Sequence, residues 1–189
     1  MSVRPFARKA FTAAMMIAFV LFVAAYLHLT GGSTAVRGFR QQSSAMMSSV
    51  LPGDVFVTDL SRFTVTRGAV VVITCHGTGN LWCVTRAIGL PGDTVAVRGH
   101  RAYINGTRLD EPYADTTVDS SEDSVANRKA IVVPPDSIWV LGDNRAESYD
   151  SRFWGFLPLS AVHGRPVAIY WSWGRGEGVR WSRIGRRIR

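Results

Sequence analysis

The chain has 189 residues, enough for one domain with a substantial core and a short appendage. It carries 20 Arg but only 2 Lys, and its formal charge of +8 indicates nucleic acid, anionic lipid or acidic partners. Because no nucleic-acid-binding motif is visible, we expect no nucleic-acid partner, and the apolar N-terminus favours a membrane.

An apolar run opens the chain. Residues 10–27 contain no charged side chain, and at about 1.5 Å per residue they would span roughly 27 Å, close to a bilayer core. Three basic side chains precede the run and favour a cytoplasmic N-terminus: Arg4, Arg8 and Lys9. We therefore predict a cytoplasmic segment at 1–9, a single membrane anchor at 10–29 and an extracytoplasmic domain after it. A cleaved signal peptide is the alternative.

The extracytoplasmic part is dominated by short β-type segments. Six segments alternate in polarity or form short apolar runs, and we predict strands or hairpins in them: 54–60, 69–75, 81–90, 93–106, 130–143 and 166–173. Residues 107–130 are polar and acidic and are typical of a surface insertion. No segment has a strong helical period. The prediction is an all-β domain at 30–173, a small coiled barrel or sandwich.

Two cysteines flank the turn of one predicted hairpin. Cys75 and Cys83 would face each other across it and form a disulfide in an oxidising compartment. Two separate thiols are the alternative. With only His76 nearby, this pair is too sparse for zinc, so we predict no metal site. No cofactor motif is present either.

The last sixteen residues, 174–189, are strongly basic. They contain six Arg and one Glu. One interpretation is a solvated, partly disordered end. The other is contact with anionic lipid headgroups, to which Trp173 and Trp181 would contribute at the membrane interface.

Three motifs resemble those of the type I signal peptidases, membrane-anchored serine proteases that remove signal peptides from exported proteins. The pattern Gly-Asp-Asn-Arg-x-x-Ser-x-Asp-Ser-Arg-x-x-Gly of that family is matched at every fixed position between Gly142 and Gly155. The Ile-Gly-Leu-Pro-Gly-Asp motif stands at 88–93, followed by Tyr-Ile-Asn-Gly at 103–106. The resemblance runs from the anchor to about residue 173 and implies a β-rich peptidase domain beside the membrane.

The third motif departs from the family pattern at both catalytic positions. An ungapped alignment on Gly53 and Asp54 puts Ala45 at the position of the serine nucleophile. Thr85 stands at the position of the lysine general base, directly before Arg86. A methyl group cannot attack a carbonyl, and a threonine is no base near neutral pH. The loss of two positions favours natural divergence over a single engineered change.

The resemblance also assigns supporting roles. It places Ser43 at an oxyanion-binding position, although a turn serine bonded to its own backbone is an equal alternative. Ser148 corresponds to the residue that holds the base and would bond the Thr85 hydroxyl here. The resemblance further implies a buried, bidentate Asp150–Arg152 pair that supports the site, and pockets for small substrate residues lined by Met46 and Val84.

These observations leave three functional hypotheses. The first is a non-cleaving homologue that binds signal peptides or exported preproteins, or assists an active paralogue, at the bacterial cytoplasmic membrane with its domain outside. The second is an active signal peptidase with a displaced nucleophile such as Ser44. The third is a membrane-surface module that binds lipid through residues 174–189.

Overall fold

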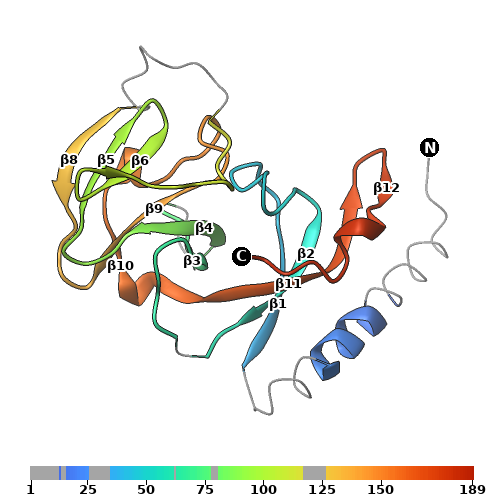
Figure 1. Cartoon of the computed structure of the whole chain (residues 1–189). Coiled ribbons are helices and arrows are strands. Elements are labelled where there is room, and N and C mark those ends of the chain that lie inside the picture. The colour runs from blue at the N-terminus through green and yellow to red at the C-terminus, as the bar shows by residue number, and fades with distance from the viewer. Residues whose placement is uncertain (1–12, 14–15, 26–34, 62, 78–80, 117–126) are drawn as a thin grey trace.

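The protein is described by a computed structural model that covers residues 13, 16–25, 35–61, 63–77, 81–116 and 127–189. The domain is mostly β, as predicted, and Figure 1 shows its strands curling around a common interior. The larger sheet has the order β1-β2-β11-β3-β4-β9-β10, with β12 paired to β11. Its strands are β1 (Val36–Arg40), β2 (Asp54–Asp59), β3 (Val70–Thr74), β4 (Trp82–Gly89), β9 (Ser137–Leu141), β10 (Leu157–Pro158), β11 (Val162–Gly174) and β12 (Gly178–Val179).

A smaller sheet has the order β7-β6-β5-β8. Its strands are β5 (Thr94–Arg98), β6 (Arg101–Ile104), β7 (Thr107–Arg108) and β8 (Arg128–Val132). The hairpin predicted at 93–106 is confirmed as β5 and β6. The surface insertion predicted at 107–130 is too long, because its first residues form β7 and its last residues begin β8. Both strands expose polar side chains, which explains why they resemble a loop in sequence. Residues 117–126 lie outside the described residues.

The long strand β11 shapes the larger sheet. It pairs with β2 along most of its length and with β3 near its start, and register shifts interrupt both ladders. Such irregularities bend a strand and increase its twist. The sheet therefore curls until β1 approaches β4, where the Arg37 guanidinium lies 4.7 Å from the centre of the Trp82 ring.

Apolar side chains fill the inside of the curled sheet. Seven buried residues form what we call the interior cluster: Met46, Val50, Phe56, Val70, Val72, Val84 and Ile169. Phe39 and Trp82 pack against it from the edges of β1 and β4. Burying each of these side chains contributes on the order of 2 kcal/mol, so the cluster fixes the two strand edges relative to each other.

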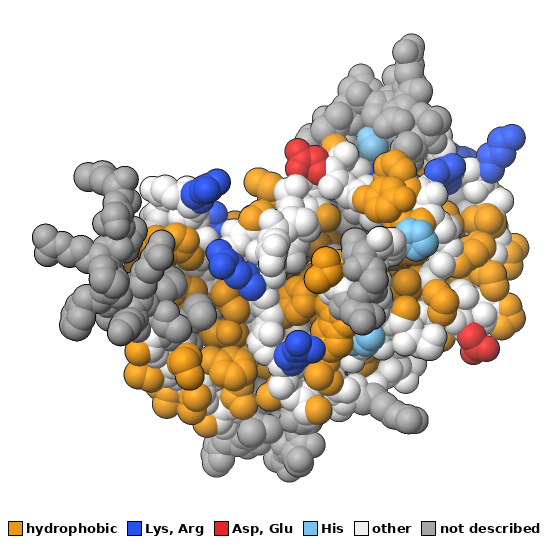
Figure 2. Space-filling model, turned by 180° about the vertical axis from the view of Figure 1, so that it is seen from behind, with side chains coloured by type: hydrophobic (Ala, Val, Ile, Leu, Met, Phe, Trp, Pro, Cys, Tyr) orange, Lys and Arg blue, Asp and Glu red, His pale blue; other side chains and the backbone are white. Residues whose placement is uncertain are grey.

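A helix at residues 16–25 packs on the outer face of the same sheet. Phe19, Phe22 and Val23 contact the Val55, Val57 and Tyr170 side chains there. The anchor predicted at 10–29 is described only at residues 13 and 16–25, and no helix in this described part is long and apolar enough to cross a membrane. Seen from behind, hydrophobic side chains cover broad areas of the surface, with a few basic ones between them (Figure 2).

The basic segment 174–189 is ordered, which corrects the expectation of a partly disordered end. A short 3-10 helix, η2 (Trp181–Arg183), places Arg183 in a buried position. Residues 185–188 then run beside β11, where the Ile169 N–H donates to the Arg186 carbonyl at 3.0 Å and the Ile188 N–H donates to the Val167 carbonyl at 2.9 Å. Ile188 packs against the interior cluster. The segment is therefore part of the fold.

Candidate active site

The loop between β1 and β2 carries Ala45, and its two ends are tied together. The Gln41 N–H donates to the Asp54 carbonyl at 2.9 Å, and the Gly53 N–H donates to the Gln41 carbonyl at 2.9 Å. Gly53 has φ +92°, and a Cβ atom there would lie 2.0 Å from the Trp173 carbonyl oxygen. Only glycine fits this position, so the Pro-Gly-Asp sequence closes the loop tightly.

The Asp54 carboxylate also fixes the conformation of this loop. It is fully buried and accepts hydrogen bonds from the Leu51 N–H at 2.8 Å and the Ser172 hydroxyl at 2.6 Å. The Arg183 guanidinium completes its surroundings with contacts of 2.5–3.0 Å. These partners satisfy the oxygens of the buried carboxylate, which would otherwise be costly to remove from water. The C-terminal segment therefore helps to fix the loop that contains Ala45.

Ala45 itself meets the segment that begins at Gly142. The Asn144 N–H donates to the Ala45 carbonyl at 3.0 Å, and the Asp143 N–H approaches the Met46 sulfur at 3.4 Å. A Cβ atom at Gly142 would lie 2.6 Å from the Ala45 carbonyl oxygen and 2.2 Å from the Ser148 hydroxyl. The glycine thus permits Ala45 and Ser148 to approach each other across it.

Thr85 reaches the same place from β4. Its neighbour Arg86 pairs with Leu141 in the β4–β9 ladder, and the Thr85 hydroxyl donates to the Leu141 carbonyl at 3.1 Å. Among the described residues it makes no hydrogen bond with Ser148, so the expected Thr85–Ser148 bond is not formed. The structure thereby brings both substituted positions, with Ser148, to the segment around Gly142.

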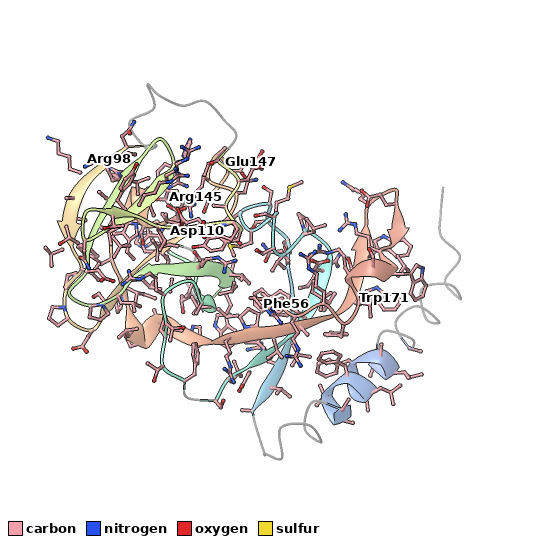
Figure 3. The ribbon with its side chains drawn as sticks, viewed as in Figure 1. Phe56, Arg98, Asp110, Arg145, Glu147 and Trp171 are labelled. Atoms are coloured by element: carbon pink, nitrogen blue, oxygen red, sulfur yellow. The ribbon has the colours of Figure 1, made fainter. Side chains whose placement is uncertain are left out.

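The two serines before Ala45 have different surroundings. The Gln41 side-chain amide donates to the Ser43 hydroxyl at 3.1 Å and to the Ser43 carbonyl at 2.9 Å. Within the described part of the chain the exposed Ser43 hydroxyl donates to no acceptor, so its proton is available to a ligand. The Ser44 hydroxyl instead donates to the Glu147 carboxylate at 2.7 Å, and Figure 3 shows Glu147 beside this loop.

A buried arginine beside Thr85 forms a network that the sequence did not reveal. The Arg86 guanidinium makes two contacts of 2.7 Å with the Asp143 carboxylate, and it also donates to the Gly68 carbonyl at 2.7 Å. The Ser49 hydroxyl bridges the ion pair, at 2.5 Å from Asp143 and 3.0 Å from Arg86. The Tyr113 ring lies 3.7 Å from the guanidinium centre, and burial raises the pKa of Tyr113 above its usual range. Both ionic residues lie in recognisable motifs, but only the fold shows that they pair.

The predicted ion pair between Asp150 and Arg152 is present. It is buried and bidentate, with contacts of 2.8 and 2.9 Å. Asp150 also accepts the Gly142 N–H at 3.0 Å, while Arg152 lies 3.0 Å from the His100 ring nitrogen Nδ1. The pair therefore braces the backbone of the glycine that Ala45 contacts. It contributes no reacting group.

Three described side chains that could act as bases, Lys129, His163 and His76, have no recorded contact with the Ala45 loop. Lys129 is exposed on β8, in the smaller sheet. His163 contacts Thr74 at 2.6 Å and stacks on Trp82 at 4.3 Å, and its burial lowers its pKa. His76 stacks on Trp154. Among the described residues no cluster of three His, Cys, Asp or Glu side chains is arranged to hold a metal ion.

The two predicted pocket residues lie in one place, because Met46 and Val84 both belong to the interior cluster. They form the floor between two strand edges. Among the described residues β1 pairs only with β2, and β9 covers β4 only from Arg86 onward. The outer edge of β1 and the first half of β4 therefore present backbone groups that can accept an extended chain.

The two cysteines are neighbours on the β3–β4 hairpin. The structure holds both as thiols, each half-buried, and a disulfide between them stays a prediction. Burial first, and then contact with Cys75, raises the pKa of Cys83 well above its usual range.

A comparison with protein families gives one match to most of the chain. Residues 10–171 fit the family model described as "Signal peptidase, peptidase S26". This match covers the Ala45 loop, β4 and the segment that begins at Gly142.

Individual relatives agree with that match. The chain is 46% identical over 88 residues to a signal peptidase I of Leptolyngbya laminosa, covering 47% of this chain and 40% of the relative. It is 36% identical over 110 residues to a signal peptidase I of Bacillus caldolyticus, covering 53% of this chain and 59% of that protein. The matches thus span about half the length of these curated relatives. A crystal structure of a signal peptidase I from Enterococcus faecalis V583 is 31% identical, covering 56% of this chain and 98% of that one, with a TM-score of 0.48.

Proposed function

Because the chain belongs to the signal peptidase family, peptidase S26, we propose that it binds extended signal-peptide segments of exported preproteins without cutting them. The observation that carries this proposal is the pair Ala45 and Thr85 at the centre of an otherwise well-built site. Peptide hydrolysis by this family type requires an attacking oxygen and a base beside it.

The missing nucleophile is decisive for chemistry. The Ala45 side chain has no oxygen. Of the two serine hydroxyls before it, Ser43 accepts a hydrogen bond from Gln41 and Ser44 donates one to Glu147. Loss of the nucleophile and base of a serine protease lowers turnover by about 10⁶. The residual rate comes from substrate binding and from the groups that stabilise the oxyanion. The Ser43 hydroxyl is suited to stabilising the oxyanion.

The base is missing as well. The Thr85 hydroxyl donates to the Leu141 carbonyl. Arg86 forms a buried ion pair with Asp143, and a guanidinium offers no hydrogen-bond acceptor. A lysine amine that is neutralised by burial would serve, but the described lysine, Lys129, lies on the other sheet.

Peptide binding needs less than catalysis. An extended peptide can add as a strand along the uncovered edges of β1 and β4, with backbone hydrogen bonds providing affinity. Met46 and Val84 beneath these edges favour small side chains. Signal peptides with small residues before their cleavage point suit such a groove. We place this activity at the bacterial cytoplasmic membrane, on its outer side, with lipid and an active paralogue as further partners.

A second candidate function is residual cleavage through a displaced nucleophile. It is favoured by the Ser44–Glu147 contact of 2.7 Å, which pairs a hydroxyl with a proton acceptor at the correct loop. An exposed carboxylate is, however, a much weaker base than a desolvated amine. We therefore rank this candidate below binding.

The test uses the full chain in detergent with a fluorescent signal peptide that contains Ala-x-Ala. Binding is measured by anisotropy and cleavage by mass spectrometry, for the natural protein, Ala45→Ser, and the double variant Ala45→Ser/Thr85→Lys. The single variant is the matched control, because it supplies an oxygen without a base. A peptide with both alanines replaced by Trp is the control for the preference of the groove for small side chains.

We expect the natural protein to bind the Ala-x-Ala peptide and leave it intact, and the double variant to cut it. Cleavage by the natural protein at the expected bond would overturn the non-cleaving proposal, and its loss in Ser44→Ala would then identify the displaced nucleophile. Equal affinity for the Ala-x-Ala and Trp peptides would overturn groove binding.

A further inference from the structure

The cysteine pair lies on the β3–β4 hairpin, on the face of β4 opposite to the floor of the proposed groove, because Cys83 and Val84 pack into different clusters. It takes no part in the function proposed above. We propose that Cys75 and Cys83 form a thiol–disulfide exchange site, at which a disulfide-bearing partner or small oxidised disulfide converts the two thiols into an intramolecular disulfide.

The hairpin register places both thiols on one face. Ile73 pairs with Cys83 in the β3–β4 ladder, and the Cys75 N–H donates to the Leu81 carbonyl at 2.8 Å. Cys75 therefore stands opposite Leu81, and its diagonal neighbour across the ladder is Cys83. Residues two apart on a strand share a face, and the two thiols are in hydrogen-bond contact. The register therefore makes the two thiols diagonal neighbours on one face of the hairpin.

The surroundings keep the thiols together and within reach of solvent. Cys83 packs against the apolar cluster that includes Val71, Ile73 and Ala87, and Trp154 packs against the same cluster. The His76 ring, which directly follows Cys75, stacks on the Trp154 ring at 5.2 Å. Both cysteines remain half-buried rather than enclosed, as a site for exchange with another molecule requires.

The exchange balances with a partner disulfide as the oxidant. One protein thiolate attacks a partner sulfur, forming a mixed disulfide and releasing the first partner thiol. The second protein thiolate then attacks the protein sulfur of that mixed disulfide, which forms the Cys75–Cys83 bond and releases the second partner thiol. The two protons lost by the protein end on the two released thiols, and the partner disulfide is reduced by two electrons.

The two cysteines have different roles in this sequence. Burial raises the pKa of Cys83, and contact with Cys75 raises it further, so Cys83 forms thiolate less readily. Because the thiolate is the nucleophile, Cys75 makes the first attack and Cys83 resolves the mixed disulfide.

The new bond would act on the groove, and this consequence rests on the proposed function. Cys83 precedes Val84 and Thr85 on the half of β4 that β9 leaves uncovered. A cross-link to β3 restricts this edge before a peptide arrives, which lowers the ordering cost of binding. We therefore expect the oxidised protein to bind the Ala-x-Ala peptide more tightly than the reduced protein.

The experiment treats the full chain in detergent with oxidised glutathione, blocks remaining thiols with a maleimide and measures intact mass. The natural protein should lose two hydrogens and retain no glutathione. Cys83→Ser should retain one glutathione on Cys75, and Cys75→Ser should react at least roughly tenfold more slowly at Cys83.

Retention of two glutathiones by the natural protein would overturn the proposal, because the sulfurs would then be out of bonding reach. Persistence of both thiols at an oxidant level that modifies Cys83→Ser would overturn it equally. Peptide anisotropy on the oxidised and reduced protein, with Cys75→Ser as the control, tests the groove separately. Loss of peptide binding in both states would count against the proposed function, while the mass result still decides the exchange site.

Discussion

The centre of the site and its frame differ sharply. At the centre, Ala45 and Thr85 lack the groups that the family chemistry needs. The frame around them keeps four buried ion pairs: Arg86–Asp143, Arg145–Glu111, Arg152–Asp150 and Arg183–Asp54. A catalytic group can disappear without cost to folding, whereas removal of one partner of a buried pair leaves an uncompensated charge. The presence of the buried ion pairs therefore indicates only that the fold is maintained. Whether the protein can cleave a peptide depends on the residues at positions 45 and 85.

The largest effect is expected where the frame is most enclosed. Asp143→Ala would leave the Arg86 guanidinium buried without its carboxylate and should lower the free energy of unfolding by about 3–5 kcal/mol. Urea unfolding followed by tryptophan fluorescence measures this. The matched control is Arg165→Ala, because the Arg165 side chain is 54% exposed and the buried Asp59 carboxylate keeps hydrogen bonds from the Ser61 N–H and hydroxyl. That change should cost no more than about 1 kcal/mol. Equal losses in the two variants would remove the distinction between frame and surface.

A somewhat smaller loss is expected at the pair that joins the C-terminal segment to the Ala45 loop. Arg183→Met should cost about 1–3 kcal/mol, because Ser172 and the Leu51 N–H still bond the Asp54 carboxylate. The same unfolding assay applies. The control is Arg186→Gln/Arg187→Gln, since both side chains are exposed. If the control destabilises the protein as much as Arg183→Met, the segment is held by its surface charge instead of by Asp54.

This arrangement also changes how lipid binding by residues 174–189 should be tested. Deletion of the segment would remove Arg183 from a buried carboxylate and the strand-like pairing of 185–188 with β11. A loss of vesicle binding could then result from unfolding as well as from the loss of charge. The double glutamine variant at Arg186 and Arg187 lowers the charge and keeps the backbone contacts, so it separates the two causes.

Sequence patterns predicted the local elements well and the long-range partners poorly. Alternation and apolar runs located most strands, because a half-buried strand leaves its period in the sequence. The Asp150–Arg152 pair was predictable, since its members are two residues apart within a recognised motif. Arg86 and Asp143 are separated by 57 residues in the chain, and no local pattern records that they meet. The same is true of Arg183 and Asp54.

The short edge strands and the basic end were misjudged for a related reason. β7 and β8 expose polar residues, so their sequence matches that of a loop. Residues 174–189 resemble a solvated tail because five of their six arginines are not fully buried, and the decisive one is identified only by its partner. The positions of Ala45 and Thr85 at the site centre followed from motif alignment. The hydrogen bonds of these two residues could not be predicted from the alignment, and the prediction of a Thr85–Ser148 bond was wrong.

A modest, pH-dependent effect is expected at the second Pro-Gly-Asp turn. Asp93 accepts the Leu90 N–H as Asp54 accepts the Leu51 N–H, but its arginine partner, Arg67, is 30% exposed. Burial alone would raise the pKa of Asp93. The bonds from Arg67 and the Leu90 N–H outweigh it, so the pKa is lowered from its ordinary value of 3.8.

A lowered carboxylate pKa stabilises the fold above the unfolded-state pKa, and this contribution is lost as the pH falls through the folded-state value. Arg67→Ala should therefore cost up to about 1 kcal/mol at pH 7, and the difference from the natural protein should shrink below about pH 4. Urea unfolding at pH 7, 5 and 3 measures it, with Arg186→Gln/Arg187→Gln, which removes two exposed charges, as the control at each pH. A difference that grows on acidification would contradict the assigned ion pair.

The smallest effect is expected at the centre itself, and it tests whether the loop still has room for the missing oxygen. Ala45 is half-buried, its carbonyl is fixed by the Asn144 N–H, and a serine there adds one polar atom at a partly solvated position. Ala45→Ser should change the free energy of unfolding by no more than about 0.5 kcal/mol. A loss of more than about 1.5 kcal/mol would show that Ser148 and Gly142 have closed around the methyl group. The double variant could then not recover cleavage for steric reasons, and its inactivity would say nothing about the groove. If Ala45→Ser leaves the free energy of unfolding unchanged, the loop has room for the serine oxygen. Cleavage by the double variant would then depend only on the two restored catalytic groups.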